Sequence, residues 1–219
     1  MKLLIVGILI GLLSSVCHAK GVGIHGAARE GDLARVKKYL AGDPKLVSSR
    51  DGAGRTPLTA AAIGGQKEVV VFLLSQGADV NDRGFMRMTP MADMAAGWGQ
   101  RDDKKCTGIA EVLLSHGALI DAIDAYGTTP LYRAAESGHT QMVRLLLEKG
   151  ADTSIADNEG QTALHVAAVN GRKDIVELLV KAKARLDVKD RGGLTPLKDA
   201  EVFNQFDVVE FLKASGASE

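Results

Sequence analysis

The sequence repeats itself at a nearly fixed interval, and this periodicity restricts the possible folds more than any other feature. The tripeptide Thr-Pro-Leu or a close variant occurs five times, with threonines spaced 33, 40, 33 and 33 residues apart. Four of the five prolines stand in this motif. A period of this length predicts stacked similar units rather than one globular core. The copies begin at Thr56, Thr89, Thr129, Thr162 and Thr195.

Each copy has the features of two helices joined by a turn. The motif threonine can cap a helix N-terminus, and proline suits the first helical position. A run of small residues follows, as at residues 60–62, which lets neighbouring helices approach closely. A second segment carries apolar residues at helical spacing, as at Val70, Leu73 and Leu74, and glycine ends it. Asp-to-Gly turns, as at residues 124–127, separate the units.

A period of 33 residues with a T-P-L-H-x-A pattern resembles the ankyrin repeat. The copy most similar to this pattern is residues 160–168, and the Gly-Ala-Asp segments at 77–79 and 150–152 match the segment between repeats. The resemblance covers essentially everything after the first nineteen residues. It implies an all-α solenoid of helix-turn-helix units with short β-hairpin tips.

The resemblance divides the chain into six units behind a leader. The first unit lacks the Thr-Pro pair, and the last has Lys198, Asp199, Glu201 and Asn204 where His, Ala or Gly are usual. Terminal repeats need a polar outer face because nothing stacks on them, so we expect both units to be caps. The expected units are a degenerate N-terminal repeat at 20–50, repeats at 51–82, 83–122, 123–155 and 156–188, and a C-terminal capping repeat at 189–219.

Residues 1–19 are predicted to be a cleaved signal peptide. Lys2 precedes an uncharged, largely apolar run over residues 3–13, and Cys17 and Ala19 suit a signal-peptidase site. The run is shorter than the roughly 20 residues of a spanning helix, so no stable membrane span is expected after cleavage. Lipid attachment at Cys17 stays open. We expect an exported protein, periplasmic or secreted, in a bacterial or eukaryotic host.

The charge balance and the absence of catalytic motifs argue against several function classes. Lysine plus arginine equals aspartate plus glutamate, 27 each, which argues against nucleic-acid binding. The G-x-G-x-x-G at residues 21–26 lacks the strand and helix of a dinucleotide site. The four histidines after residue 19, including His165 in the T-x-L-H position, fall in different repeats and do not converge as metal ligands would. We expect no catalytic residue, cofactor or metal.

The unit at 83–122 departs from the others and is the candidate binding site. Its tip reads Gly-Phe-Met-Arg-Met at 84–88, and seven extra residues lie between Trp98 and Thr107. Aromatic residues and methionine are enriched in the cores of interfaces. We expect a partner protein to bind the concave face at an exposed patch of Phe85, Met86, Met88, Trp98 and Tyr126.

Other interpretations of the same residues stay open. Met91 and Met94 are expected to fill the core instead, and Trp98 can seal the insertion. Cys106 is either a handle for a mixed disulfide or a small buried side chain. The tip itself is either a binding element or a structural one.

The sequence therefore favours a non-catalytic protein-protein interaction module, monomeric when free. The resemblance to exported bacterial ankyrin-repeat proteins implies an inhibitor or immunity protein of a toxic effector as the specific role. The alternative is a small-ligand-binding protein or an enzyme that uses the inserted turn at 98–107.

Overall fold

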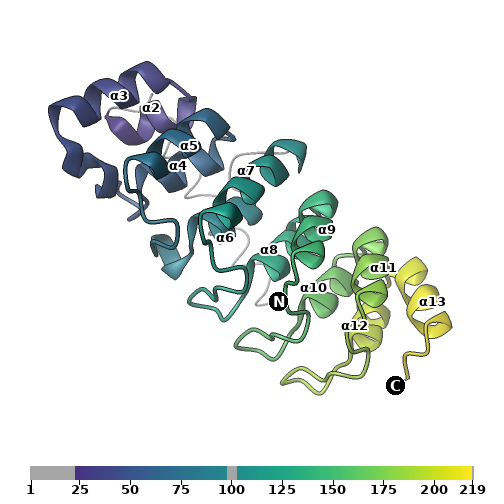
Figure 1. The fold of residues 1–219 in the computed structure, drawn as a ribbon. Helices are drawn as coiled ribbons and strands as arrows, with labels where there is room; N and C mark the ends of the chain where they lie inside the picture. Colours follow the sequence, from purple (N-terminus) through teal and green to yellow (C-terminus); the bar gives the residue numbers. More distant parts are fainter. Residues whose placement is uncertain (1–22, 98–102, 219) are drawn as a thin grey trace.

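The computed structural model describes residues 23–97 and 103–218, which form a solenoid of six helix pairs. Figure 1 shows the pairs stacked side by side in chain order. The pairs are α2 (Ile24–Glu30) and α3 (Leu33–Gly42), α4 (Pro57–Ile63) and α5 (Lys67–Ser75), α6 (Pro90–Ala95) and α7 (Asp103–Ser115), α8 (Pro130–Ser137) and α9 (Thr140–Glu148), α10 (Ala163–Val169) and α11 (Lys173–Lys181), and α12 (Pro196–Val202) and α13 (Phe206–Ala214).

The motif threonines begin the first helix of five pairs, as the sequence predicts. The Thr129 hydroxyl accepts the Tyr132 N–H at 3.2 Å, and Pro130 occupies the first helical position. In α10 the cap is reciprocal. The Thr162 side chain accepts a hydrogen bond from the backbone of His165, and the His165 Nδ1 atom accepts the Thr162 N–H at 3.1 Å. These local caps explain why short helices begin at a fixed point in each of these five units.

The core lies between successive pairs. The first helices stack on one another from α2 through α12, and the second helices stack from α3 through α13. Alanines such as Ala61, Ala134 and Ala167 are fully buried where the first helices meet, and leucines fill the remaining space. Each unit thus buries its apolar side chains mainly against its neighbours, which explains why a single unit would lack a core.

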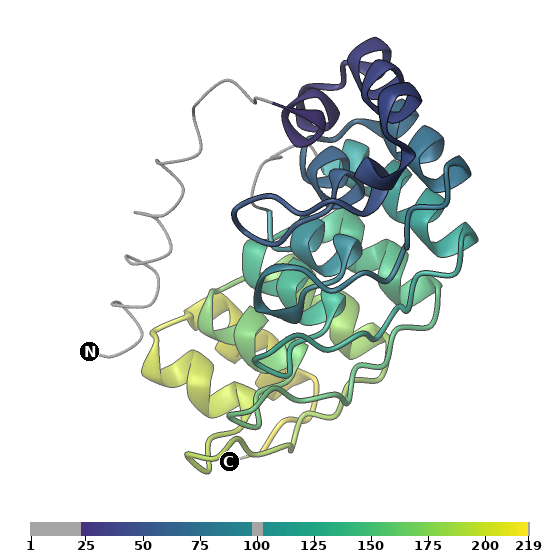
Figure 2. The same cartoon turned by 90° about the vertical axis from the view of Figure 1, so that its left-hand side faces the viewer.

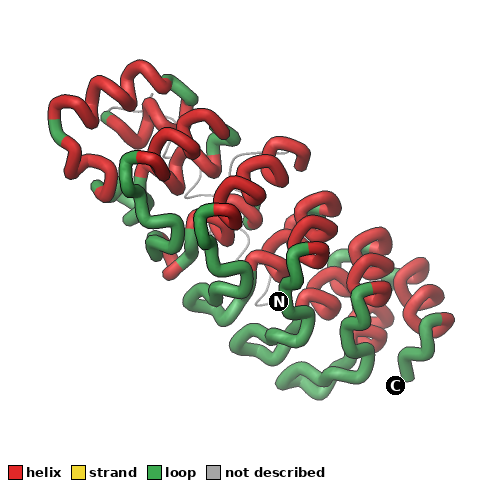
Figure 3. The backbone as a smooth tube through the Cα atoms, viewed as in Figure 1, coloured by secondary structure: helices red, strands yellow, loops and turns green. Residues whose placement is uncertain are grey.

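Hairpin-shaped loops project from one side of the stack in a row, which both views show (Figures 2 and 3). The Asp124 N–H donates to the Thr128 C=O at 3.1 Å and closes one loop, and the Asp124 carboxylate accepts two N–H groups of the same loop. The described residues contain no strand, because each loop closes on a single such hydrogen bond. The tips are hairpin loops rather than β-hairpins.

Backbone hydrogen bonds join consecutive loops into one surface. The Ala125 N–H donates to the Met86 C=O at 2.8 Å, and the Asn158 N–H donates to the Tyr126 C=O at 2.9 Å. The Arg191 N–H continues the row at 2.8 Å from the Glu159 C=O. The loop tips therefore keep fixed positions relative to one another.

The loop at 84–88 is built differently from its neighbours. Gly84 stands where the other loops have aspartate, and the tip forms the 3₁₀ turn η3 (Phe85–Arg87). Met86 and Arg87 adopt φ of 51° and 59°, a left-handed region that costs a non-glycine residue about 1 kcal/mol. A second 3₁₀ turn, η2 (Pro44–Ser48), follows α3.

The last repeat differs from the expected polar cap. Val202, Phe203 and Phe206 are 55%, 46% and 74% exposed, which places apolar side chains on a surface that no further described helix covers.

Met91, Met94 and Cys106 are buried, so the core interpretation of the two methionines is confirmed. No helix within residues 23–97 and 103–218 is long and apolar enough to cross a membrane.

Candidate functional site

The row of hairpin loops carries the residues that the sequence analysis selected. Met86 is 39% exposed and Tyr126 is 44% exposed, and they stand on consecutive loops that the Ala125–Met86 backbone hydrogen bond joins. Phe85 is half-buried beside Met86. The structure therefore brings three of the five selected residues to adjacent tips.

Met88 does not belong to the exposed patch. Its side chain is only 3% exposed, because Met88 lies at the base of the hairpin loop, where its C=O accepts the Gly84 N–H at 3.0 Å, and its side chain turns inward. Its counterpart Thr128 is equally buried. Met88 is thus a packing residue under the loop, which corrects its assignment to the binding patch.

The inserted turn is only partly within the described structure. Trp98 lies outside the described residues, as do residues 99–102, so its membership of the patch stays a prediction. The described part begins with α7, where Cys106 is buried among core residues. Burial of that thiol favours its interpretation as a packing residue.

An ion pair across two repeats supports the tip at Phe85. The Arg55 guanidinium donates to both oxygens of Asp93, from Nε at 2.7 Å and from an Nη atom at 3.1 Å. The Asp93 side chain is fully buried, and Arg55 lies 5.8 Å from the centre of the Phe85 ring. Burial raises the pKa of Asp93 and Arg55 opposes that rise. The arginine thus links helix α6, which carries Asp93, to the underside of the loop tip at Phe85.

The next repeat repeats this arrangement with the charges exchanged. Arg133 on α8 contacts the fully buried Asp124 of its own loop at 2.6 Å, and its guanidinium lies 5.6 Å from the centre of the Tyr126 ring. Burial acts to lower the Arg133 pKa, but the hydrogen bond to Asp124 and the charge of Glu136 outweigh it and raise the pKa. Phe85 and Tyr126 thus each lie against an arginine that a buried aspartate holds.

This arrangement suits the binding of another molecule through the aromatic rings of Phe85 and Tyr126. A guanidinium fixed against an aromatic face restrains the ring while leaving its outer edge available. Among the described residues, no group of three His, Cys, Asp or Glu side chains could hold a metal ion. His165 has a structural role, because its Nδ1 accepts the Thr162 N–H at 3.1 Å and its Nε2 donates to the Val188 C=O at 3.1 Å.

The sequence analysis missed the charged residues beneath the tips. Asp93 and Arg133 each stand four residues after a motif threonine, where Ala60 and Val166 occur in other copies. A charged residue at a position that is otherwise apolar was the available signal. Only the structure shows which residue pairs with which, because Arg55 and Asp93 belong to different repeats.

Comparison with known proteins agrees with the architecture over nearly the whole described chain. The family described as ankyrin repeats (many copies) matches residues 93–147, 131–180 and 164–212. A second model, ankyrin repeats (3 copies), matches residues 24–117. The chain belongs to the ankyrin-repeat family. The repeats, the all-α solenoid and the general role of this family in protein-protein interaction are thereby established.

The related proteins are longer and carry the similarity in one part of their length. Serine/threonine-protein kinase VIK of Arabidopsis thaliana is 44% identical over 92 residues, which are 42% of this ankyrin-repeat chain and 19% of the relative. E3 ubiquitin-protein ligase XBAT33 of the same plant is 34% identical over 131 residues, 59% and 24% of the two chains. Ankyrin repeat and KH domain-containing protein mask-1 of Caenorhabditis elegans is 32% identical over 132 residues, 59% and 5%. The chain therefore spans less than a quarter of each.

These relatives contradict the expected export. They are eukaryotic proteins whose names denote a protein kinase, a ubiquitin ligase and a KH-domain protein, and not periplasmic or secreted ankyrin-repeat proteins. The prediction of export is therefore wrong. It rested on the apolar run and small residues within positions 1–19, which lie outside the described residues.

Proposed function

We propose that this ankyrin-repeat chain binds another protein through its hairpin loops and inner helices, and that the contact is centred on Phe85, Met86 and Tyr126. The observation that carries the proposal is the exposure of Met86 and Tyr126 on two tips joined by a backbone hydrogen bond. Large apolar side chains held outward on loops are typical of interface cores.

The cost of building this surface supports a binding role. The loop at 84–88 holds two non-glycine residues at positive φ, and strain of this kind is concentrated at functional sites. The buried arginine–aspartate pairs restrain the loops before any partner arrives, which lowers the entropy lost on binding. Trp98, which lies outside the described residues, belongs to the proposed surface only as a prediction from the sequence.

A capture experiment with matched variants tests the proposal. The full chain is immobilised and exposed to an extract of the organism that encodes it, beside a Met86→Ser/Tyr126→Ser variant. The control is Val71→Ser, which removes a side chain of equal exposure (44%) from α5, away from the loops. Loss of one captured protein from the hairpin variant, but not from the control, supports the proposal. Identical capture by all three forms contradicts it.

The proposed role has no catalytic step of its own. Ankyrin repeats are generally interaction modules, and the alternative of a ligand-binding or catalytic site in the inserted turn involves residues 98–102, outside the described structure. Inhibition of a toxic effector is a narrower form of the proposal, in which the repeats cover the effector's active surface. Adding the purified chain to the captured partner and measuring that partner's activity tests this form.

A further inference from the structure

Two sequence differences change the charge of the hairpin loop at 84–88 relative to the other loops of the row. The other four hairpin loops begin with an aspartate and have glycine at the fourth position, whereas this loop begins with Gly84 and has Arg87 at the fourth position. The loop therefore lacks the acidic group of its neighbours and gains a basic one. The aspartates are Asp51, Asp124, Asp157 and Asp190, and the glycines are Gly54, Gly127, Gly160 and Gly193.

The local structure explains the first difference but not the second. An added Cβ at Gly84 would lie only 3.1 Å from the C=O of Gly54, so close packing of the two loops accounts for glycine there. Arg87 has a φ of 59°, and its counterpart Gly127 has a φ of 79°. Glycine adopts this left-handed region readily, whereas a residue with a side chain is strained in it. The loop would therefore fold more easily with glycine than with Arg87.

The Arg87 side chain is exposed, and it has no hydrogen bond or ion pair with another residue in the described ranges. Three other arginines close to the tips each donate to a carboxylate or a carbonyl group of the chain. They are Arg55, which binds Asp93, Arg133, which binds Asp124, and Arg83, which binds the Ile123 C=O at 2.7 Å. Arg87 thus presents its guanidinium to solvent from a loop tip.

The carboxylates near the two tips are engaged elsewhere. Asp93 and Asp124 are fully buried in their ion pairs with arginine. The Asp51 carboxylate accepts the N–H groups of Ala53 and Arg55 at 2.9 Å each. The tip at Arg87 is therefore locally basic, although the chain as a whole has 27 basic and 27 acidic side chains.

Arg87 stands directly beside the apolar residues of the hairpin site. Met86 precedes it, so the two Cα atoms are only about 3.8 Å apart. The Met86 C=O also accepts the Ala125 N–H, which holds the loop of Tyr126 alongside. A guanidinium offers paired N–H donors that match the two oxygens of a carboxylate. The tips thus combine exposed apolar side chains with a group that selects for an acidic one.

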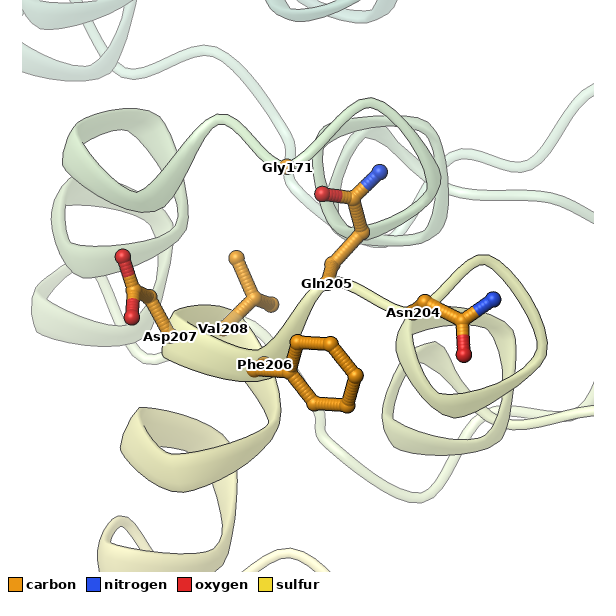
Figure 4. Close-up of a pocket in the computed structure, with 6 residues that line it drawn as sticks. All are labelled: Gly171, Asn204, Gln205, Phe206, Asp207 and Val208. Carbon is orange, nitrogen blue, oxygen red and sulfur yellow. The ribbon is translucent and has the colours of Figure 1, made fainter.

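The exposed apolar side chains of the last repeat have different electrostatic surroundings. The turn after α12 holds a shallow pocket of about 230 Å³ lined by Gly171 and residues 204–208. In Figure 4 the side chains of Phe206 and Asp207 both leave the start of α13. Phe206 is 74% exposed and Asp207 is also exposed, so an apolar side chain here stands next to an acidic one. This surface serves as a control for binding through apolar contact alone.

We propose that the hairpin site takes a segment of the partner protein in which an aspartate or glutamate lies beside apolar side chains. The carboxylate contacts the Arg87 guanidinium, and the apolar side chains cover Met86 and Tyr126. The inference rests on the proposed function, because it names the chemistry of the partner at the same site. The arginine at a strained position that four other loops give to glycine is the observation that selects an acidic segment.

The test selects short peptides from a random display library on the immobilised full chain. The wild-type chain should enrich peptides with an acidic residue next to apolar ones. An enriched peptide should bind at least about tenfold more weakly to Arg87→Gly, where tenfold corresponds to about 1.4 kcal/mol. Arg87→Lys keeps the charge and should retain more of the affinity. Arg87→Gly should not melt below the wild-type chain, because it restores the residue that suits this φ.

Two control variants should keep full affinity for the same peptide. Arg191→Gln removes an exposed arginine from the tip of another loop, and Phe203→Ser/Phe206→Ser removes exposed apolar side chains from the last repeat. Enriched peptides without an acidic residue, equal binding by Arg87→Gly, or no enrichment at all would overturn the acidic segment as the occupant. Loss of affinity in Phe203→Ser/Phe206→Ser would also overturn it, because the peptide would then bind the last repeat.

The variant Met86→Ser/Tyr126→Ser separates this inference from the proposed function. It should also bind the enriched peptide at least about tenfold more weakly, which is about 1.4 kcal/mol. Peptides that lose affinity for this variant but not for Arg87→Gly would overturn the acidic segment and leave the hairpin site in place. Peptides that bind both variants as well as the wild-type chain would contradict the hairpin site itself.

Discussion

Arg55 and Asp93 stand 38 residues apart in sequence and form a two-point ion pair that joins the loop of one repeat to the inner helix of the next. Their side chains are 14% and 0% exposed. A contact of this kind couples neighbouring repeats, on which the stability of a solenoid depends. It also fixes the arginine under the Phe85 ring.

Arg55→Ala should destabilise the chain by about 3 kcal/mol at neutral pH, because it leaves the Asp93 carboxylate buried without its cation. Urea unfolding followed by circular dichroism measures the free energy. In the variant no arginine opposes the effect of burial, so the pKa of Asp93 in the folded chain lies above its unfolded value. The loss of stability should therefore shrink as the pH falls, because protonation removes the buried charge. Arg185→Ala, in an exposed pair with Asp187, is the control and should leave the free energy of unfolding essentially unchanged, because solvent screens that pair.

Asp199→Asn should stabilise the chain at pH 7 by about 1–2 kcal/mol. The folded pKa of Asp199, about 6, lies above its ordinary value of 3.8, so the ionised form opposes folding. This destabilisation is absent below the ordinary value, grows as the pH rises, and is complete above about 6. Comparing unfolding free energies of the variant and the wild type at pH 4 and pH 7 measures it. An equal difference at both values would show that Asp199 does not titrate in this range.

Gly64→Ala should cost about 2–3 kcal/mol, because an added Cβ would overlap the carbonyl group of Arg29 in the preceding repeat. The clash is with backbone, which cannot rotate away as a side chain could. Gly42→Ala is the matched control, since a Cβ at that helix end meets nothing within 4 Å. Thermal melting should separate the two variants clearly, and similar melting temperatures would mean that the repeats can shift apart at Gly64.

The His165 ring should titrate below pH 6.5 in the folded chain. Burial lowers its pKa, and the Thr162 N–H donates to its Nδ1 atom, which favours the neutral ring. Because the folded pKa lies below the unfolded value, the stability linked to His165 is complete above pH 6.5 and is lost as the pH falls through the folded pKa. Nuclear magnetic resonance of the ring protons, assigned with His165→Gln, measures the midpoint. A value at or above 6.5 would contradict the structural role of this ring.

The sequence was a good guide where structure depends on local chemistry. The Thr-Pro motif at Thr129 begins α8 because a hydroxyl cap and a proline act on the residues next to them. The buried alanines and leucines follow from helical spacing, and the repeat period identified the family. The exposure of Met86 and Tyr126 was also correctly anticipated from their place on loop tips.

The misjudged or missed features depend on which way a side chain turns and what approaches it from another repeat. Met88 is two residues from the exposed Met86, yet the closed loop turns it inward. The last repeat has polar residues at several expected positions, but Val202, Phe203 and Phe206 remain exposed. Asp93 pairs with Arg55, the residue before the motif threonine of the preceding repeat. The corresponding residue for Asp199 is Gln161, so Asp199 gains no arginine.

The sequence by itself determined the helix pairs, their order and the repeat family, because caps, turns and apolar spacing act over a few residues and recur with the period. Only the tertiary structure decided which charged groups are neutralised and which apolar side chains remain exposed. Those properties depend on contacts between residues about one repeat apart, where stacking brings Arg55 to Asp93 and leaves Asp199 without a cation.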